Sequence, residues 1–206
     1  MAVSTPVYLD NHSTTRCDPR VVEAMLPYFT ELYGNAASRT HRYGFEAKSA
    51  VELARERVAS LIGSSPKEII WTSGATEANN LALIGAAEAQ QTKGRHIVIS
   101  QIEHKSIIDA ADVLERRGWR VTRIPPNSEG IISAESVIES LCDDTTVVSL
   151  MFANNEIGTI QPVGSVGAAC RSREIIFHVD AVQAAGRVPI HVVDHQIDLL
   201  TLSAHK

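Results

Sequence analysis

The chain has 206 residues, 44% of them hydrophobic and 21% charged, with a formal net charge of −5 and an isoelectric point near 5.9. This is the composition of a globular protein with one large domain, or one domain plus a fragment. The acidic balance, without a basic block, argues against a nucleic-acid ligand. No apolar run reaches the ~20 residues of a membrane span, and the first ten residues do not resemble a secretory signal.

The three cysteines, Cys17, Cys142 and Cys170, are odd in number and widely spaced. This pattern is neither a disulfide framework nor a set of metal ligands. We therefore expect free thiols, a reducing and cytoplasmic setting, and no metal site.

Helical and strand patterns alternate along the chain. Helices are predicted where apolar residues recur at helical spacing, as at Val51, Ala54 and Val58, and several segments stop at a glycine such as Gly63 or Gly118. In chain order, the predicted helices cover residues 19–29, 44–63, 75–94, 104–118, 133–141 and 163–173. The predicted strands, which are short apolar runs, cover residues 68–74, 95–100, 119–125, 145–155, 174–181 and 198–206.

This alternation predicts an α/β fold with a mostly parallel sheet flanked by helices on both faces. Continuous apolar strands, rather than alternating ones, are typical of strands that are buried on both sides. The first ~40 residues are less regular and belong either to an arm that wraps the main domain or to a second lobe. Sheets of this kind bind ligands beyond the carboxyl ends of their strands, so the polar residues that follow the strands are the candidate site.

Three polar clusters follow the earlier strands. In "TSGATE", the backbone N–H groups of Ala75 and Thr76 could bind a phosphate at a helix start, although plain capping by Thr76 explains the same residues. In "IEHKS", His104 could stack on an aromatic ligand or move protons, or simply begin a helix. In "ANNE", Asn155 could bind a ligand oxygen or belong to an ordinary loop.

An acid and a lysine stand at the ends of the last two predicted strands. Asp180 follows "IIFHV" directly, and a carboxylate at the end of a buried strand needs a partner; Gln183 would share its site if a helical turn begins there. Lys206 ends "SAHK", with Ser203 and His205 beside it as anion binders. A structural Asp and a surface lysine are the alternatives. Together, however, the five clusters describe a pyridoxal phosphate pocket, with a lysine for the aldehyde and an acid for the ring nitrogen.

The whole chain, from "VYLDNHSTT" to "SAHK", resembles class V aminotransferase-like, fold type I pyridoxal phosphate enzymes, most closely the cysteine desulfurases of the NifS/IscS group. The motifs that carry the resemblance are "YLDNHSTT", "YGNAASRTHRYG", "TSGATEANNLAL", "EHKSI", "NNEIGTIQP", "HVDAVQAAG" and "SAHK".

The resemblance implies a role for each candidate residue. Lys206 matches the Schiff-base lysine, Asp180 the acid at the pyridine nitrogen, and His104 the residue that stacks on the ring and transfers protons. Gln183 and Asn155 match the residues at the phenolic oxygen of the ring. The implied phosphate cradle consists of Ala75, Thr76, Ser203 and His205.

The implied reaction converts L-cysteine to L-alanine and leaves the sulfur as a persulfide on an enzyme cysteine. The sulfur then passes to a sulfur-acceptor or iron–sulfur scaffold protein. The resemblance also implies a homodimer. It divides the chain into an N-terminal arm, residues 1–15, and a pyridoxal phosphate-binding large domain, residues 16–206, without the small C-terminal domain.

The resemblance places the persulfide cysteine and the arginine for the substrate carboxylate beyond residue 206, so we expect full activity to need further residues. These would lie on a longer chain or on a separate C-terminal polypeptide. A selenocysteine lyase or another class V lyase is an alternative within the cofactor class. A non-catalytic scaffold for sulfur transfer is an alternative of a different class.

Overall fold

The computed structural model describes residues 5–206. They form two compact units: one contains the residues up to Ile70 together with His205–Lys206, and the other contains Trp71–Ala204. Four residues of the predicted arm, 1–4, lie outside the described part. The predicted division at residue 15 stays a prediction.

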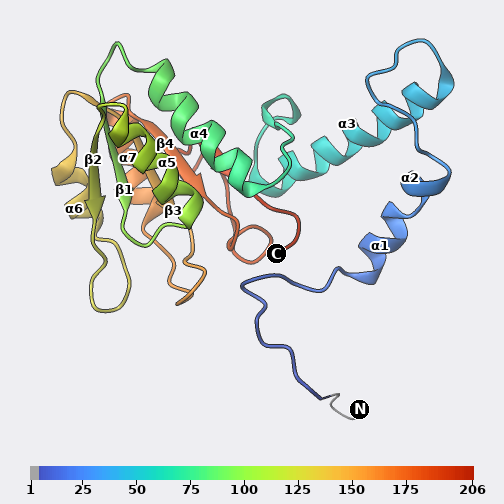
Figure 1. The fold of residues 1–206 in the computed structure, drawn as a ribbon, viewed down its shortest axis with the longest axis horizontal. Helices are drawn as coiled ribbons and strands as arrows, with labels where there is room; N and C mark the ends of the chain where they lie inside the picture. The colour runs from blue at the N-terminus through green and yellow to red at the C-terminus, as the bar shows by residue number, and fades with distance from the viewer. Residues whose placement is uncertain (1–4) are drawn as a thin grey trace. The chain divides into compact units, whose positions relative to one another are not determined.

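The larger unit is built on a parallel sheet of five strands in the order β2-β1-β3-β4-β5 (Figure 1). The strands are β1 (His96–Ser100), β2 (Arg120–Ile124), β3 (Thr145–Met151), β4 (Ile176–Asp180) and β5 (Leu199–Thr201). The helix α4 (Ala75–Ala89) precedes β1, and α5 (Lys105–Arg116), α6 (Ala134–Ser140) and α7 (Val163–Ser172) connect successive strands as far as β4. The predicted α/β class and parallel sheet are confirmed.

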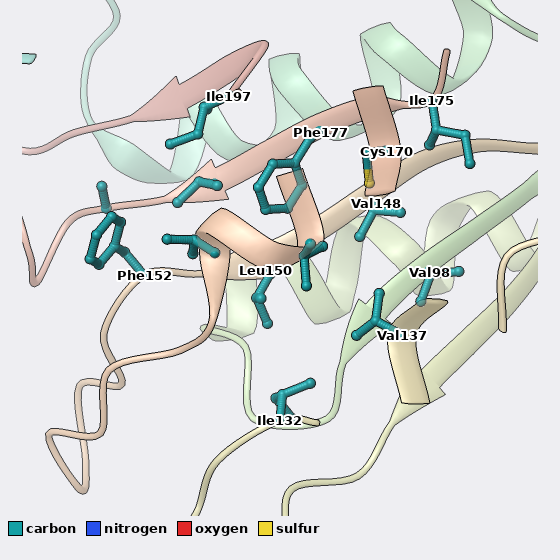
Figure 2. Close-up of a cluster of buried hydrophobic side chains, with 14 of the residues drawn as sticks. Val98, Ile132, Val137, Val148, Leu150, Phe152, Cys170, Ile175, Phe177 and Ile197 are labelled. Carbon is teal, nitrogen blue, oxygen red and sulfur yellow. The ribbon is translucent and has the colours of Figure 1, made fainter. Parts of the chain in front are cut away.

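Alternate residues of the central strands face two different hydrophobic clusters, as the two-residue period of a strand requires. On one face, Ile97 and Ile99 of β1 pack with α4 and α5, represented by Leu83 and Leu114. On the other face, Val98 and Val148 pack with α6 and α7, and Phe177 of β4 lies in the same cluster (Figure 2). Helices thus cover both faces of the sheet, and the ends of the strands are left uncovered.

The N-terminal unit is helical. Its elements are α1 (Pro19–Met25), α2 (Pro27–Thr30), α3 (Arg42–Ile62) and the short 3₁₀ helix η1 (Pro66–Glu68). The helix predicted over 19–29 is divided because Pro27 begins a new helix, where its missing N–H costs nothing. The predicted end of α3 is confirmed: Gly63 is its C-cap, with a φ of 69°.

The strand predicted over residues 68–74 is wrong. Residue 68 ends η1, and residues 69–74 have no regular structure. A strand is stabilised by a neighbour in a ladder, and within the described residues none pairs with this segment; Ile70 and Trp71 are 73% and 49% exposed. The apolar run was therefore not a sign of burial. Among residues 5–206, no helix is both long enough and apolar enough to cross a bilayer.

Candidate active site at the carboxyl edge of the sheet

Polar side chains gather where the parallel strands of the larger unit end. Ser100 ends β1 and is followed by Glu103 and His104. Asn154 and Asn155 follow β3, Asp180 ends β4, and Ser203 follows β5. Because all five strands are parallel, their carboxyl ends meet at one edge. The sheet therefore brings most of the predicted site residues to the same side of this unit.

Asp180 is the last residue of β4 and is 5% exposed. Its Oδ1 accepts a hydrogen bond from the Val182 backbone N–H at 3.0 Å, and its Oδ2 accepts one from Asn79 Nδ2 at 2.8 Å. Both partners are N–H donors, which suits a carboxylate because that group accepts hydrogen bonds and donates none. A helical turn begins directly afterwards, since the N–H groups of Ala184 and Ala185 both donate to the Ala181 carbonyl.

Asn79 connects Asp180 to the start of α5. It is fully buried on α4, and its Nδ2 also donates to Ser106 Oγ at 2.9 Å. The amide must present its nitrogen to Asp180, because the opposite orientation would set two acceptors against each other. Asn79 Oδ1 is left buried without a hydrogen-bond partner.

His104 lies at the other end of this connection. It is the N-cap of α5: its Nδ1 accepts the Ser106 backbone N–H at 3.2 Å and lies 2.8 Å from Ser106 Oγ. Since Nδ1 is an acceptor, the ring carries its proton on Nε2 in the neutral form. The ring itself is exposed. His104 therefore does begin a helix, as the plainer interpretation held, and it also presents a ring that a ligand can reach.

The first turn of α4 carries Ala75 and Thr76. Its N-cap is Gly74 in an extended conformation, no side chain caps the helix, and the space beside the Gly74 Cα is open. Capping by Thr76, the alternative weighed above, is thus not what the structure has. Asn79 lies one turn further along and contacts Asp180, so this uncapped end lies near the end of β4.

The remaining predicted residues of this unit lie in loops at the same edge. Asn155 is half-buried, and its Nδ2 donates to Glu156 Oε1 at 2.7 Å. Gln183 lies in the turn after Asp180, and its Oε1 accepts from Arg187 at 3.1 Å. Ser203 is half-buried two residues after β5.

Lys206 and His205 belong to the N-terminal unit. Lys206 Nζ donates to the backbone carbonyls of His12 and Ser13, the latter at 2.6 Å. The His205 carbonyl accepts from the Thr15 N–H at 3.2 Å and from Thr15 Oγ1 at 3.0 Å. The "NHSTT" motif and the last two residues thus form one local structure. That Lys206 meets Asp180 in a shared pocket stays a prediction.

Sequence reasoning did not select Asn79, Ser106 or Glu103. Asn79 stands inside a helix and Ser106 near the start of one, where polar residues usually face solvent. The available signal was their position: Asn79 is one turn from "SGAT", while Glu103 and Ser106 flank His104. Glu103 is fully enclosed, and this burial raises the pKa of its carboxyl to about 8.

A second cluster, outside this edge, combines His96, Cys142 and Asp144, whose ligand atoms lie within 4.8 Å of one another. The Arg120 guanidinium already supplies a positive charge to it, with Nη2 2.9 Å from Cys142 Sγ and 2.7 Å from Asp144 Oδ1. Cys17 is an exposed free thiol, whereas Cys170 is buried in α7, where burial raises its pKa to about 12.

The fold and the sequence together establish the family. The model of the family described as Aminotransferase class-V matches residues 7–206, so the chain belongs to that family. The fold type I assignment for its larger unit is confirmed by structures of NifS-like proteins, and the family uses pyridoxal phosphate.

Two curated relatives show the degree of similarity. The chain is 52% identical to a mitochondrial cysteine desulfurase of Drosophila melanogaster over 201 residues, which are 98% of this chain and 44% of that protein. It is 51% identical to the cysteine desulfurase IscS of Neisseria meningitidis over 206 residues, which are 100% of this chain and 51% of that protein. The chain thus spans about half the length of the curated relatives it matches.

Two solved structures share the fold. A NifS-like protein superimposes with a TM-score of 0.93 at 41% identity, covering 97% of this chain and 55% of that one. A structure described as SspA in complex with cysteine superimposes with a TM-score of 0.93 at 36% identity, covering 96% of this chain and 57% of that one.

The residues of the larger unit fit pyridoxal phosphate. A helix N-terminus without a side-chain cap, with open space at Gly74, suits a phosphate. A buried carboxylate whose described contacts are N–H donors suits a protonated ring nitrogen. The chemistry of the donor set thus agrees with the cofactor of the family.

Proposed function

We propose that this chain carries the cofactor-binding part of a pyridoxal phosphate-dependent cysteine desulfurase, which converts L-cysteine to L-alanine and retains the sulfur as an enzyme-bound persulfide. The observation that carries the proposal is the buried Asp180 carboxylate at the end of β4, in a chain about half identical to named cysteine desulfurases. In this proposal residues 1–15 are an N-terminal arm and residues 16–206 the large domain.

The bound cofactor would act as an electron sink for the substrate carbon that loses its proton. Asp180 would keep the ring nitrogen protonated, and its enclosure supports this role because charge pairs are strong where water is excluded. His104 would stack on the ring and hold or move a proton at Nε2, the nitrogen left free by the Ser106 contact.

The other residues would bind and orient. Gln183 and Asn155 would hydrogen-bond the phenolic oxygen of the cofactor. The phosphate would be held by Ala75, Thr76, Ser203 and His205, of which the first two offer the backbone N–H groups of an uncapped helix.

Lys206 would bind the cofactor covalently through Nζ. Its hydrogen bonds to the His12 and Ser13 carbonyls would place the "NHSTT" segment beside the reactive amine. Two carbonyl acceptors would hold the free amine in one position before it reacts with the cofactor aldehyde.

The proposed substrate is L-cysteine, and the proposed partners are a sulfur-acceptor or iron–sulfur scaffold protein and a second copy in a homodimer. The persulfide cysteine and the substrate arginine would come from residues outside this chain, on one polypeptide or on a separate C-terminal half. A cytoplasmic location accords with the free thiols and the bacterial relative, although the Drosophila relative is named mitochondrial. The relatives do not favour selenocysteine lyase or scaffold activity.

The test combines this chain with the C-terminal half of the Neisseria meningitidis relative, fused or co-expressed. It measures alanine release from L-cysteine with added pyridoxal phosphate, and sulfide release with dithiothreitol present to reduce the persulfide. We expect release of both, no release with Lys206→Ala, and no preference for selenocysteine. Uptake of pyridoxal phosphate without alanine from cysteine would disprove the desulfurase assignment. Absence of uptake would disprove the cofactor site itself.

A further inference from the structure

Glu103 is an enclosed carboxyl group between β1 and β3. The residue is 5% exposed, and its Oε1 accepts hydrogen bonds from Ser100 Oγ at 2.5 Å and from the Met151 backbone N–H at 2.8 Å. Its Oε2 is buried without a hydrogen-bond partner, and no ion pair within residues 5–206 includes Glu103. The functional assignments above give this group no role.

An ionised Glu103 would be a buried charge without a counterion. Such a charge costs several kcal/mol, and the group normally takes up a proton instead. The charged group that acts on Glu103 is Asp180 at the end of β4, which has the same sign and disfavours a second anion. β1 contributes the Ser100 hydroxyl and β3 contributes the Met151 amide, and these two hydrogen bonds only partly offset the burial.

The position of Oε1 has a structural consequence. β1 pairs with β3 as far as Ile99, opposite Ser149, and β1 ends at Ser100. Glu103 Oε1 then accepts the N–H of Met151, two residues further along β3, where a backbone carbonyl would otherwise be needed. The Glu103 carboxyl therefore takes the place of the backbone carbonyl that β1 would supply if its pairing with β3 continued beyond Ser100.

The next residue in the chain is His104. The short connection from β1 to α5 is fixed to β3 and its loop by Glu103 and by Asn154, whose Nδ2 donates to the Ile102 carbonyl at 3.0 Å. Because His104 directly follows these anchors and caps α5, its ring position depends on them.

We propose that Glu103 is a positioning residue of the cofactor site: its neutral carboxyl fixes the β1–α5 connection to β3, which places His104, and adds no second negative charge beside Asp180. The link between Glu103 and the cofactor rests on the proposed function. The neutral state of the Glu103 carboxyl does not. The raised pKa of the group, about 8, agrees with it.

The first test is infrared spectroscopy of the assembled protein without cofactor, because a protonated carboxyl has its own carbonyl stretch. We expect a band at pH 7 that disappears as pH rises through about 8. Because the assembled protein contains many carboxyl groups, the comparison with Glu103→Gln assigns the band. Loss of the band in Glu103→Gln would support the assignment, and absence of the band from wild type at pH 7 would overturn it.

The second test follows the visible absorbance of bound pyridoxal phosphate against pH. Glu103→Gln keeps a neutral side chain and the Oε1 acceptor, so we expect a wild-type spectrum at pH 7. Above pH 8, where wild-type Glu103 would be ionised, we expect the two spectra to differ. Glu103→Ala removes the anchor, and we expect a shifted band and at least tenfold weaker cofactor binding. Equal impairment of both variants at pH 7, or spectra of wild type and Glu103→Gln that stay identical above pH 8, would overturn the positioning role. If the infrared band is present but no form takes up the cofactor, the proposed function fails and only the acid assignment stands.

Discussion

Asn79 Nδ2 lies 2.8 Å from Asp180 Oδ2 and donates a hydrogen bond to it across 101 residues of sequence. The same nitrogen donates to Ser106 Oγ, which lies 2.8 Å from His104 Nδ1. One buried amide thus links the end of β4, the first turns of α4 and the start of α5. In the proposed enzyme, it would orient both the acid proposed to meet the ring nitrogen and the histidine proposed to stack on the ring.

Replacement of Asn79 should therefore affect stability and cofactor binding together. Asn79→Ala leaves Asp180 Oδ2 and Ser106 Oγ without their donor, and we expect a loss of about 1–3 kcal/mol in unfolding free energy and weaker pyridoxal phosphate binding. Denaturant unfolding and a cofactor titration measure the two effects. Asn80→Ala is the matched control, since Asn80 Nδ2 donates to the Thr76 carbonyl on the exposed side of the same helix. Equal behaviour of the two variants would contradict the role of Asn79.

Asp180→Asn should reduce turnover much more than stability. The amide keeps the size of the side chain, but it cannot hold the ring nitrogen protonated, so we expect roughly 10²-fold or greater loss of alanine release. Asp180→Ala should add a stability loss because Asn79 and the Val182 N–H lose their acceptor. Unchanged turnover of either variant on cysteine would disprove this role.

His104 caps α5 and is also proposed to transfer protons. Two substitutions separate these roles. Asparagine is a preferred N-cap, so His104→Asn should retain α5 stability, whereas His104→Gln should lose about 1 kcal/mol. Both variants should slow proton transfer by about 10²–10⁴-fold in single-turnover experiments, because neither side chain can exchange a proton at neutral pH. Wild-type single-turnover rates in the stable variant would rule out proton transfer by His104.

Two buried histidines make the free energy of unfolding depend on pH. Burial lowers the pKa of His96 and of His178 to about 4, and Ser149 Oγ and Thr201 Oγ1 contact the His178 ring. A depressed pKa in the folded state gives stability that is present above the unfolded value of about 6.5 and is lost as pH falls toward 4. We expect the unfolding free energy to fall between pH 6.5 and 4, with a shallower fall in His178→Asn. His191→Asn, which replaces an exposed histidine on a loop, is the matched control for loss of a histidine side chain.

Local patterns predicted the architecture well because they depend on neighbouring residues. Apolar runs identified the strands β1 to β5, and Gly63 marked the end of a helix through its positive φ. The segment 68–74 failed because a strand also needs a partner, which its own residues cannot specify. The candidate site divides in the same way. The positions of Asp180 and His104 at the carboxyl ends of strands were predictable from the sequence, and their roles at the cofactor stay predictions. Asn79 and Glu103 were not predictable, because their roles come from contacts with β4 and β3 that appear only in three dimensions.

The most direct measurement is the site of covalent attachment of pyridoxal phosphate. The assembled protein is mixed with the cofactor, reduced with borohydride and digested, and the labelled peptide is identified by mass spectrometry. We expect the label on Lys206, its loss in Lys206→Ala, and weaker labelling in Asp180→Ala. Labelling at another lysine, or labelling that Lys206→Ala leaves unchanged, would contradict it.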